Sequence, residues 1–128
     1  MAFLLDTNVL IRLRDGDEAI TARVVALNPP VLMSIISRVE LEGGVYRDPS
    51  QAGARRQRLA ALFAAIPVLA FDDVAADAYA SILETAGYSR RKILDRMIAA
   101  QALVHRAALV TQNPADFQDV PGLEITVW

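Results

Sequence analysis

The sequence predicts an α/β protein in which a parallel sheet lies between two layers of helices. Segments with the patterns of strands and of helices alternate along the chain, which is typical of such sheets. The strand segments are short and apolar throughout, as expected of strands that are buried on both faces. The chain has 128 residues, of which 54% are hydrophobic, and shows no repeat or linker, so we expect one domain over residues 1–128.

The first half of the chain is predicted to contain two strands and four helices, divided by turn-forming residues. Gly16 lies between two acids that separate the first two helices, and Pro29 and Pro30 follow the end of the second. The strands are apolar or β-branched runs, and the last helix carries apolar residues at helical spacing. In chain order the predicted elements are strand Phe3–Asp6, helices Asn8–Arg14 and Glu18–Leu27, strand Val31–Ser34, and helices Ser37–Tyr46 and Ala52–Ile66.

The second half is predicted to contain three strands, two longer helices and one helical turn. Gly87 is the expected C-cap of the first of these helices. The predicted inward face of the second consists of Leu94, Met97, Ile98 and Ala102. In chain order the predicted elements are strand Pro67–Ala70, helices Asp73–Ala86 and Arg91–Arg106, strand Leu109–Thr111, the turn Pro114–Phe117 and strand Leu123–Val127.

The composition excludes several kinds of site. The chain has no cysteine, which excludes disulfide bonds and zinc–cysteine centres. Its net charge of −2 is not that of a polycation, so binding to nucleic acid requires a local basic patch. No apolar run is long enough to cross a membrane and the first residues lack the basic region of a signal peptide, so we expect a cytoplasmic protein without a membrane partner.

Four acidic residues follow a strand or begin the next helix, namely Asp6, Glu40, Asp95 and Asp116. In a parallel sheet these positions meet at the carboxyl edge, where ligands bind in open α/β sheets. Carboxylates that are brought together repel one another unless a cation neutralises them. Oxygen ligands select hard cations, so the pattern favours Mg²⁺ or Mn²⁺, which can activate water and stabilise the charge of phosphoryl transfer.

Each of these acids also has a structural interpretation. Ser37 and Glu40 have the spacing of a capping box, in which Glu40 only bonds the start of a helix. Asn113 and Asp116 flank a proline in a pattern that is typical of a helix N-terminus. Asp95 can offset the dipole of the helix in which it lies. The combination of four acids, rather than any one of them, favours the metal site.

Four segments resemble the motifs of PIN-domain ribonucleases, and most closely those of the toxins of VapBC-type toxin–antitoxin pairs. The resemblance covers nearly the whole chain, and the segments are Leu4–Ile11, Ser37–Leu41, Asp95–Ala100 and Val110–Phe117. It implies a PIN-like three-layer α/β/α domain with a five-stranded parallel sheet. It also implies Mg²⁺- or Mn²⁺-dependent endonucleolytic cleavage of RNA.

The resemblance assigns roles to residues of the acidic site. Asp6, Glu40 and Asp95 are implied to be the core catalytic metal ligands. Supporting residues near them are implied to be Thr7, Asn8 and Thr111. Members of the family differ at the fourth acidic position; Asn113 is uncharged here, so Asp116 is the expected fourth ligand and Asn113 a supporting residue.

An acidic site repels RNA unless basic residues attract the strand. We expect RNA to contact the basic residues around the third motif, which are Arg90, Arg91, Lys92 and Arg96. A second basic cluster is equally consistent with a solvated helix face, and it consists of Arg55, Arg56 and Arg58. His105, the one histidine, is expected to be a surface or packing residue rather than a general base.

The resemblance also implies partners, which are a second copy of the chain in a homodimer and a small VapB-type antitoxin. DNA is expected to be contacted only through the antitoxin, because this chain has no DNA-reading motif. The main alternative is a catalytically inactive PIN-like module that binds a partner without cutting RNA. Asn8 argues against a haloacid-dehalogenase phosphatase, which requires a second Asp at this position, and the absence of glycines after the first strand argues against a nucleotide cradle.

Overall fold

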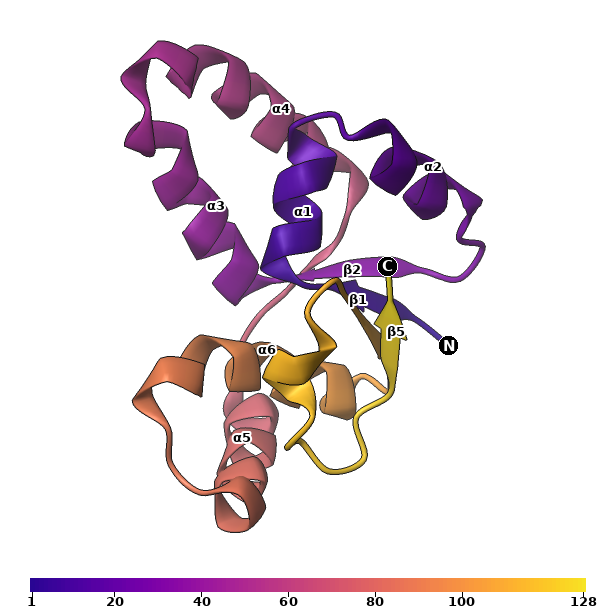
Figure 1. Ribbon diagram of the computed structural model, residues 1–128, viewed down its shortest axis with the longest axis vertical. Coiled ribbons are helices and arrows are strands. Elements are labelled where there is room, and N and C mark those ends of the chain that lie inside the picture. The colour runs from indigo at the N-terminus through magenta and orange to yellow at the C-terminus, as the bar shows by residue number, and fades with distance from the viewer.

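Five parallel strands form a sheet at the centre of the computed structural model, which describes residues 1–128 (Figure 1). The strands are β1 (Phe3–Leu5), β2 (Val31–Ser34), β3 (Val68–Leu69), β4 (Ala108–Thr111) and β5 (Ile125–Val127). Their order across the sheet is β3-β2-β1-β4-β5, and every neighbouring pair is parallel. The predicted α/β class and the predicted five-stranded parallel sheet are confirmed.

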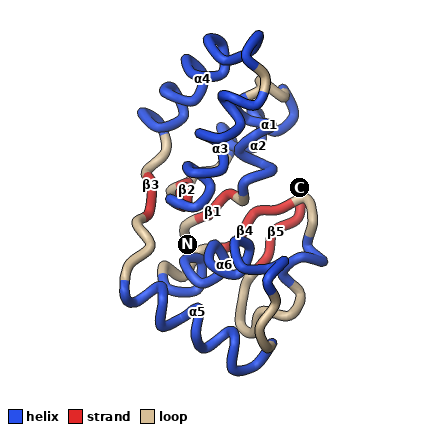
Figure 2. The backbone as a smooth tube through the Cα atoms, turned by 90° about the vertical axis from the view of Figure 1, so that its left-hand side faces the viewer, coloured by secondary structure: helices blue, strands red, loops and turns tan.

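Helices cover both faces of this sheet. On one side lie α1 (Thr7–Arg14), α2 (Glu18–Ala26), α3 (Ile35–Arg47) and α4 (Ala52–Ala65), and on the other lie α5 (Asp73–Ala86) and α6 (Ile93–Val104) (Figure 2). Three short 3₁₀ helices complete the structure, at Pro49–Gln51, Arg90–Lys92 and Pro114–Phe117. The predicted three-layer arrangement is confirmed. None of the helices combines the length and the hydrophobicity needed to cross a lipid bilayer.

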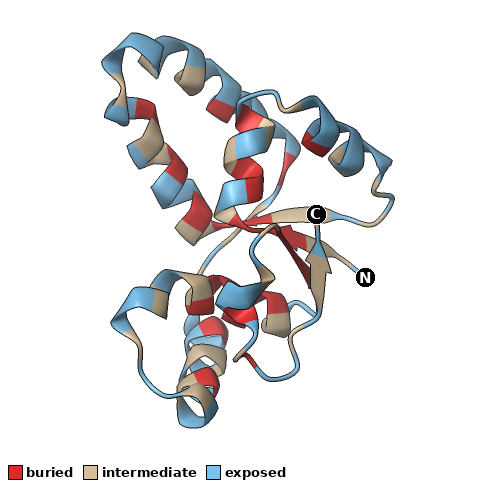
Figure 3. Cartoon of the chain, viewed as in Figure 1, coloured by how far each residue is buried: buried red, intermediate tan, exposed pale blue.

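The side chains of the central strands alternate between two hydrophobic cores, one on each face of the sheet. Figure 3 shows that buried residues gather in the central strands and in the helices on both sides of them. Leu4 of β1 and Leu109 of β4 belong to the core formed with α5 and α6. Leu5 and Val110, the next residues of the same strands, belong to the core formed with α1 to α4. Since successive strand residues point to opposite faces and both faces are covered, the inner positions of these strands are apolar, and the polar Thr111 stands only at the end of β4.

Polar residues at the carboxyl ends of two strands serve as helix N-caps, and this explains two differences from the predicted boundaries. Asp6, predicted as the last residue of the first strand, accepts a hydrogen bond from the Val9 amide at 2.9 Å and caps α1. Ser34 accepts one from the Ile36 amide at 3.0 Å, so α3 begins two residues before the predicted start at Ser37. A side-chain acceptor at the N-cap satisfies an amide that has no partner within the helix.

The predicted helix Arg91–Arg106 is divided in the structure. Its start is the 3₁₀ helix Arg90–Lys92, and α6 follows over Ile93–Val104. Ile98 and Ala102 are buried as predicted, but Leu94 is 46% exposed. The prediction for Leu94 is wrong because the first turn of α6 lies at the carboxyl edge, where the sheet ends and no strand covers it.

Two adjacent glycines in α3 differ in what surrounds them. A Cβ atom at Gly44 would lie 3.1 Å from Nη1 of Arg14, a buried side chain of α1, whereas a Cβ atom at Gly43 would meet nothing within 4 Å. Glycine within a helix costs about 1 kcal/mol relative to alanine. The absence of a side chain at Gly44 therefore allows α1 and α3 to approach at this point, whereas Gly43 has no such packing role.

We expect Gly43→Ala to raise the free energy of unfolding by about 0.5–1 kcal/mol, because alanine favours the helix and open space surrounds the new methyl group. Gly44→Ala should gain less or lose stability, because Arg14 has to move. Urea denaturation of the two variants and the parent protein measures the difference. Equal stabilisation by both substitutions would show that the position of Arg14 does not constrain α3.

Candidate functional site

The candidate site lies where the order of the strands reverses. From β1 the chain proceeds outward to β2 and β3, whereas β4 and β5 lie on the other side of β1. Crossovers therefore diverge at the carboxyl ends of β1 and β4, which opens a crevice there. Asp6 follows β1 and Thr111 ends β4, so the two side chains meet at this point.

Asp6 is buried directly after β1, at this edge of the sheet, with 5% of its surface exposed. One carboxylate oxygen, Oδ1, accepts the capping bond from Val9, and the other, Oδ2, accepts a hydrogen bond from Thr111 Oγ1 at 2.5 Å. Burial raises the pKa of Asp6 above its usual range, the two hydrogen bonds partly oppose this, and the charge of Asp116 adds to it. Asp6 is thus held in one orientation and carries a charge that its surroundings disfavour.

Asp95, in the first turn of α6, is a second acid with an unfavourable charge. Partial burial is the largest cause that raises the pKa of Asp95 from 3.8 to about 6, and the next causes are the charges of Asp116, Glu40 and Asp6, in that order. Lys92 acts in the opposite direction but does not cancel them. All four acids that the sequence pattern singled out therefore lie close enough to influence one another.

Glu40 extends from α3 toward the site, where a hydroxyl group of α1 bonds its carboxylate and a second hydroxyl, from α3, contacts the first. Thr7 Oγ1 donates to Glu40 Oε1 at 2.8 Å, and the same hydroxyl lies 2.8 Å from the hydroxyl of the buried Ser37. The capping-box interpretation of Ser37 and Glu40 is wrong, because Ser34 is the N-cap of α3 and Ser37 is already inside the helix. Glu40 is therefore left available to the crevice rather than used to start the helix.

Two residues near the end of β4, Asp116 and Asn113, are the candidates for the fourth ligand position, and they lie in different surroundings. Asp116 is exposed on the 3₁₀ helix Pro114–Phe117 and contributes the charge that acts on Asp6 and Asp95. Asn113 stands at the N-cap position of this helix, but its side chain makes no capping bond. Its backbone amide instead donates to Thr111 Oγ1 at 3.0 Å. Thr111 therefore links the Asn113 backbone to the Asp6 carboxylate.

The four carboxylates are neighbours but do not form a finished ion site. No three acidic or histidine side chains are grouped closely enough to hold a metal ion as the structure stands. Their chemistry nevertheless fits a hard divalent cation, because all the donors are carboxylate oxygens and the charge of Asp95 is disfavoured by three other acids. A bound cation would remove this repulsion.

Of the four side chains in the basic cluster near the third motif, two are exposed and two form ion pairs. Arg90 and Arg91 are exposed. Lys92 pairs with Asp119 at 3.1 Å, and Arg96 is buried, where it donates to the same carboxylate at 2.7 Å and to the Gly87 carbonyl at 2.5 Å. The prediction that Arg96 contacts RNA is wrong, because its guanidinium ties the segment before α6 to the rest of the fold.

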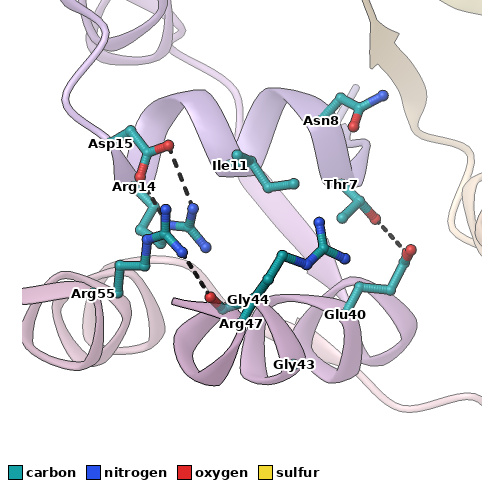
Figure 4. A pocket seen from close by; sticks show the side chains of 10 residues that line it. All are labelled: Thr7, Asn8, Ile11, Arg14, Asp15, Glu40, Gly43, Gly44, Arg47 and Arg55. Carbon is teal, nitrogen blue, oxygen red and sulfur yellow. Dashed lines mark hydrogen bonds and ion pairs between the residues drawn. The ribbon is translucent and has the colours of Figure 1, made fainter. Parts of the chain in front are cut away.

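Two polar hollows open on either side of Asn8. One, of about 600 Å³, extends along α1 and α3 from Thr7 and Glu40 (Figure 4). The other, of about 440 Å³, is lined by polar side chains that include Gln112 and Asn113. Asn8 and Ile11 line both hollows, so they form the ridge between them.

Two partners that shape the site have roles that sequence patterns did not indicate. Ser37, expected to cap a helix, bonds Thr7 from within α3, one helical turn before Glu40. Asp119 holds Lys92 and Arg96 from 27 and 23 residues away, and no local pattern marks such a pairing.

Solved structures with the same fold come from toxin–antitoxin complexes. VapBC-1 from nontypeable Haemophilus influenzae matches with a TM-score of 0.83 and 28% identity, over 100% of this chain and 98% of that chain. DNA-bound VapBC from Salmonella typhimurium matches with a TM-score of 0.78 and 27% identity, over 100% and 98%. VapBC2 from Rickettsia felis, bound to a DNA fragment from their promoter, shares the fold with a TM-score of 0.87 and 23% identity, over 100% and 99%.

Comparison of the sequence with curated proteins finds no match. The family description "PIN domain", however, matches residues 3–123, which include the strands β1 to β4 and all four acids of the crevice. The chain therefore belongs to the PIN-domain family.

Proposed function

We propose that this protein is a divalent-cation-dependent endoribonuclease that acts as the toxin of a type II toxin–antitoxin pair. The observation that carries the proposal is the gathering of four acids at the carboxyl ends of β1 and β4, where each of the other three raises the pKa of Asp95. Repulsion within such a group of acids destabilises the fold, and a bound cation would relieve that repulsion. Membership of the PIN-domain family supports a nuclease.

The proposed ligands of the cation are Asp6, Glu40, Asp95 and Asp116. Oxygen donors of this kind suit Mg²⁺ or Mn²⁺, and such an ion, when bound, lowers the pKa of water and stabilises charge on a phosphate. Thr111 restrains the Asp6 carboxylate, and Thr7 restrains Glu40. These two hydroxyls therefore orient two of the ligands before any ion arrives.

The proposed substrate is RNA, which has to approach an acidic crevice. Arg90 and Arg91 are exposed on the segment that leads into α6, two turns or less from Asp95. Their guanidinium groups can contact phosphates of a strand that approaches the crevice from this side, and they offset its negative charge. Lys92 shares its charge with Asp119 and contributes less.

The proposed partner is a VapB-type antitoxin. The similar structures are VapBC assemblies, two of them with DNA, and they cover nearly the full length of this chain. A neutralising partner has a clear target here, because any cationic side chain that entered the crevice would be stabilised by the same four acids. DNA would then be contacted through the antitoxin.

One observation favours a second candidate, a PIN-like module that binds a partner without cutting RNA. No three of the acids are grouped closely enough to hold an ion without rearrangement. In that case the acidic crevice would serve only to receive a basic side chain of the partner. Cleavage assays on the parent protein separate the two candidates.

We expect Asp6→Asn, Glu40→Gln and Asp95→Asn each to reduce RNA cleavage by at least about 100-fold, because each removes a proposed ligand. The measurement is cleavage of a labelled single-stranded RNA with Mg²⁺ or Mn²⁺, and with EDTA as the metal-free condition. Asp77→Asn is the matched control, since Asp77 is exposed on α5, away from the crevice. Undiminished cleavage by purified Asp6→Asn or Asp95→Asn, or full activity in EDTA, would refute the proposed mechanism.

The raised pKa of Asp95 makes the stability of the metal-free protein depend on pH. Its pKa is about 6 in the folded state against 3.8 ordinarily, so the folded state binds the proton more tightly. The resulting stability is fully present below pH 4 and is lost as the pH rises through 6. Relative to Asp95→Asn, the parent should lose about 1–2 kcal/mol between pH 4 and 7, less than the full pKa difference because solvent screens a half-buried group.

Urea denaturation of both proteins across this pH range measures the effect, and the difference between them removes the contributions of acids that do not interact with Asp95. Adding Mg²⁺ at pH 7 should restore stability to the parent more than to Asp95→Asn, because a cation replaces the missing proton. A difference that does not change with pH would contradict the proposed repulsion among the four acids.

Removing the two exposed arginines should weaken RNA binding without affecting the fold. For Arg90→Gln/Arg91→Gln in the Asp6→Asn background, we expect the salt slope of log K to fall by about 0.7 for each phosphate that the variant no longer binds. Fluorescence anisotropy over a salt series provides the measurement, and Arg23→Gln, an exposed arginine of α2, is the control. If the double variant keeps the parental affinity and slope, the segment before α6 does not contact RNA.

A further inference from the structure

We propose that the hollow between α1, α3 and α4 binds a backbone phosphate of the RNA strand beside the one that is cut. The inference rests on the proposed ribonuclease function and adds a binding site to it. The hollow has a volume of about 600 Å³ (Figure 4). Thr7, Asn8 and Glu40 line its end at the crevice, and Arg14, Arg47 and Arg55 line the rest.

One of the three arginines is part of the framework. Arg14 is buried, and its guanidinium pairs with the carboxylate of Asp15 through two hydrogen bonds of 3.0 and 3.3 Å. It lies against the backbone of α3 at Gly44, where a side chain would press on it. Arg14 therefore shapes the wall of the hollow, and its charge is neutralised.

The other two arginines form no ion pair with a carboxylate, although the charge of Arg55 acts at longer range on Asp48. Arg55 donates to the Gly44 carbonyl at 2.9 Å, one of the last carbonyls of α3, which lack donors within the helix. This single bond leaves the other N–H groups of Arg55 free. The side chain of Arg47, exposed at the end of α3, makes no hydrogen bond or ion pair within the chain. Figure 4 shows its side chain extending from α3 toward α1.

The lining of the hollow favours a phosphate over an apolar peptide segment. Only one of its ten lining residues, Ile11, is hydrophobic. Guanidinium groups bind phosphate oxygens through paired N–H donors, and they are less strongly hydrated than ammonium groups. An apolar partner would leave Arg47 and the free N–H groups of Arg55 buried without acceptors, which is costly.

The spacing along α3 places this phosphate next to the reacting one. Arg47 follows Glu40 by seven residues, which is about two turns and about 10 Å along the helix axis. Both residues therefore lie on the same face of α3, Glu40 at the crevice and Arg47 farther along the hollow, with its side chain extending toward α1 (Figure 4). A strand whose reacting phosphate lies at the acids would place a neighbouring phosphate at the arginines, where it would be held without entering the reaction.

The test compares Arg47→Gln and Arg55→Gln with Arg58→Gln. Arg58 lies on α4 like Arg55, is exposed and does not line the hollow, so it matches the change in charge. All variants carry Asp6→Asn, and binding of a labelled 15-nucleotide single-stranded RNA of mixed sequence is measured in EDTA over a salt series. Phosphate contacts carry no sequence information, so the natural target is not needed.

We expect Arg47→Gln and Arg55→Gln each to weaken binding by about tenfold and to lower the salt slope by about 0.7, with Arg58→Gln close to the parent. Arg47→Gln is the variant less able to disturb the fold, because the Arg47 side chain makes no contact that the fold needs. Thermal unfolding checks that both variants are folded. In the active enzyme, Arg47→Gln should raise KM and leave kcat unchanged, as for a group that binds substrate and transition state alike.

The outcomes separate this inference from the proposed function. Equal RNA affinity for Arg47→Gln, Arg55→Gln and Arg58→Gln overturns the phosphate site, even if the enzyme cleaves RNA. The phosphate site is also overturned if Arg47→Gln and Arg55→Gln lose binding of an acidic peptide but keep their affinity for RNA. That result would assign the hollow to a protein partner. If the parent binds RNA through Arg47 but never cleaves it, the phosphate site stands and the ribonuclease proposal fails.

Discussion

A hydrogen bond between Thr111 and Asp6 joins the ends of the two central strands where the order of the sheet reverses. The bond restrains one oxygen of Asp6, while the other caps α1 through the Val9 amide. A single buried carboxylate thus follows a strand, starts a helix and belongs to the group of four acids. The positions of the other acids follow, because α3 and α6 begin at the same edge of the sheet and carry Glu40 and Asp95 toward Asp6.

This arrangement sets stability against function. Burial opposes the charge on Asp6, and both burial and like charges oppose the charge on Asp95. The fold compensates elsewhere, since the two cores on the faces of the sheet contain buried apolar residues from the three central strands and from both helix layers. Repulsion that is tolerated at one edge of a well-packed sheet is what a cation-binding site requires before its ion arrives.

The arginines around the crevice have different roles although their side chains are chemically alike. Arg14 and Arg96 are buried against Asp15 and Asp119, and they hold helices and loops in place. Arg47 has no carboxylate partner, although it lies on the wall of the same hollow as Arg14. Pairing with an acid decides which guanidinium groups maintain the fold and which remain able to bind a phosphate.

Patterns among near neighbours in the chain were enough to predict the α/β class, the parallel sheet and the candidate acids Asp6, Glu40 and Asp95, because apolar strands, caps and acids after strands are local features. Which charges are free depends instead on tertiary contacts. Arg96 adjoins Asp95 in the sequence and resembled an RNA contact, but Asp119, 23 residues farther along, binds it in the interior. Burial and ion pairing depend on contacts between distant elements, and local patterns do not record them.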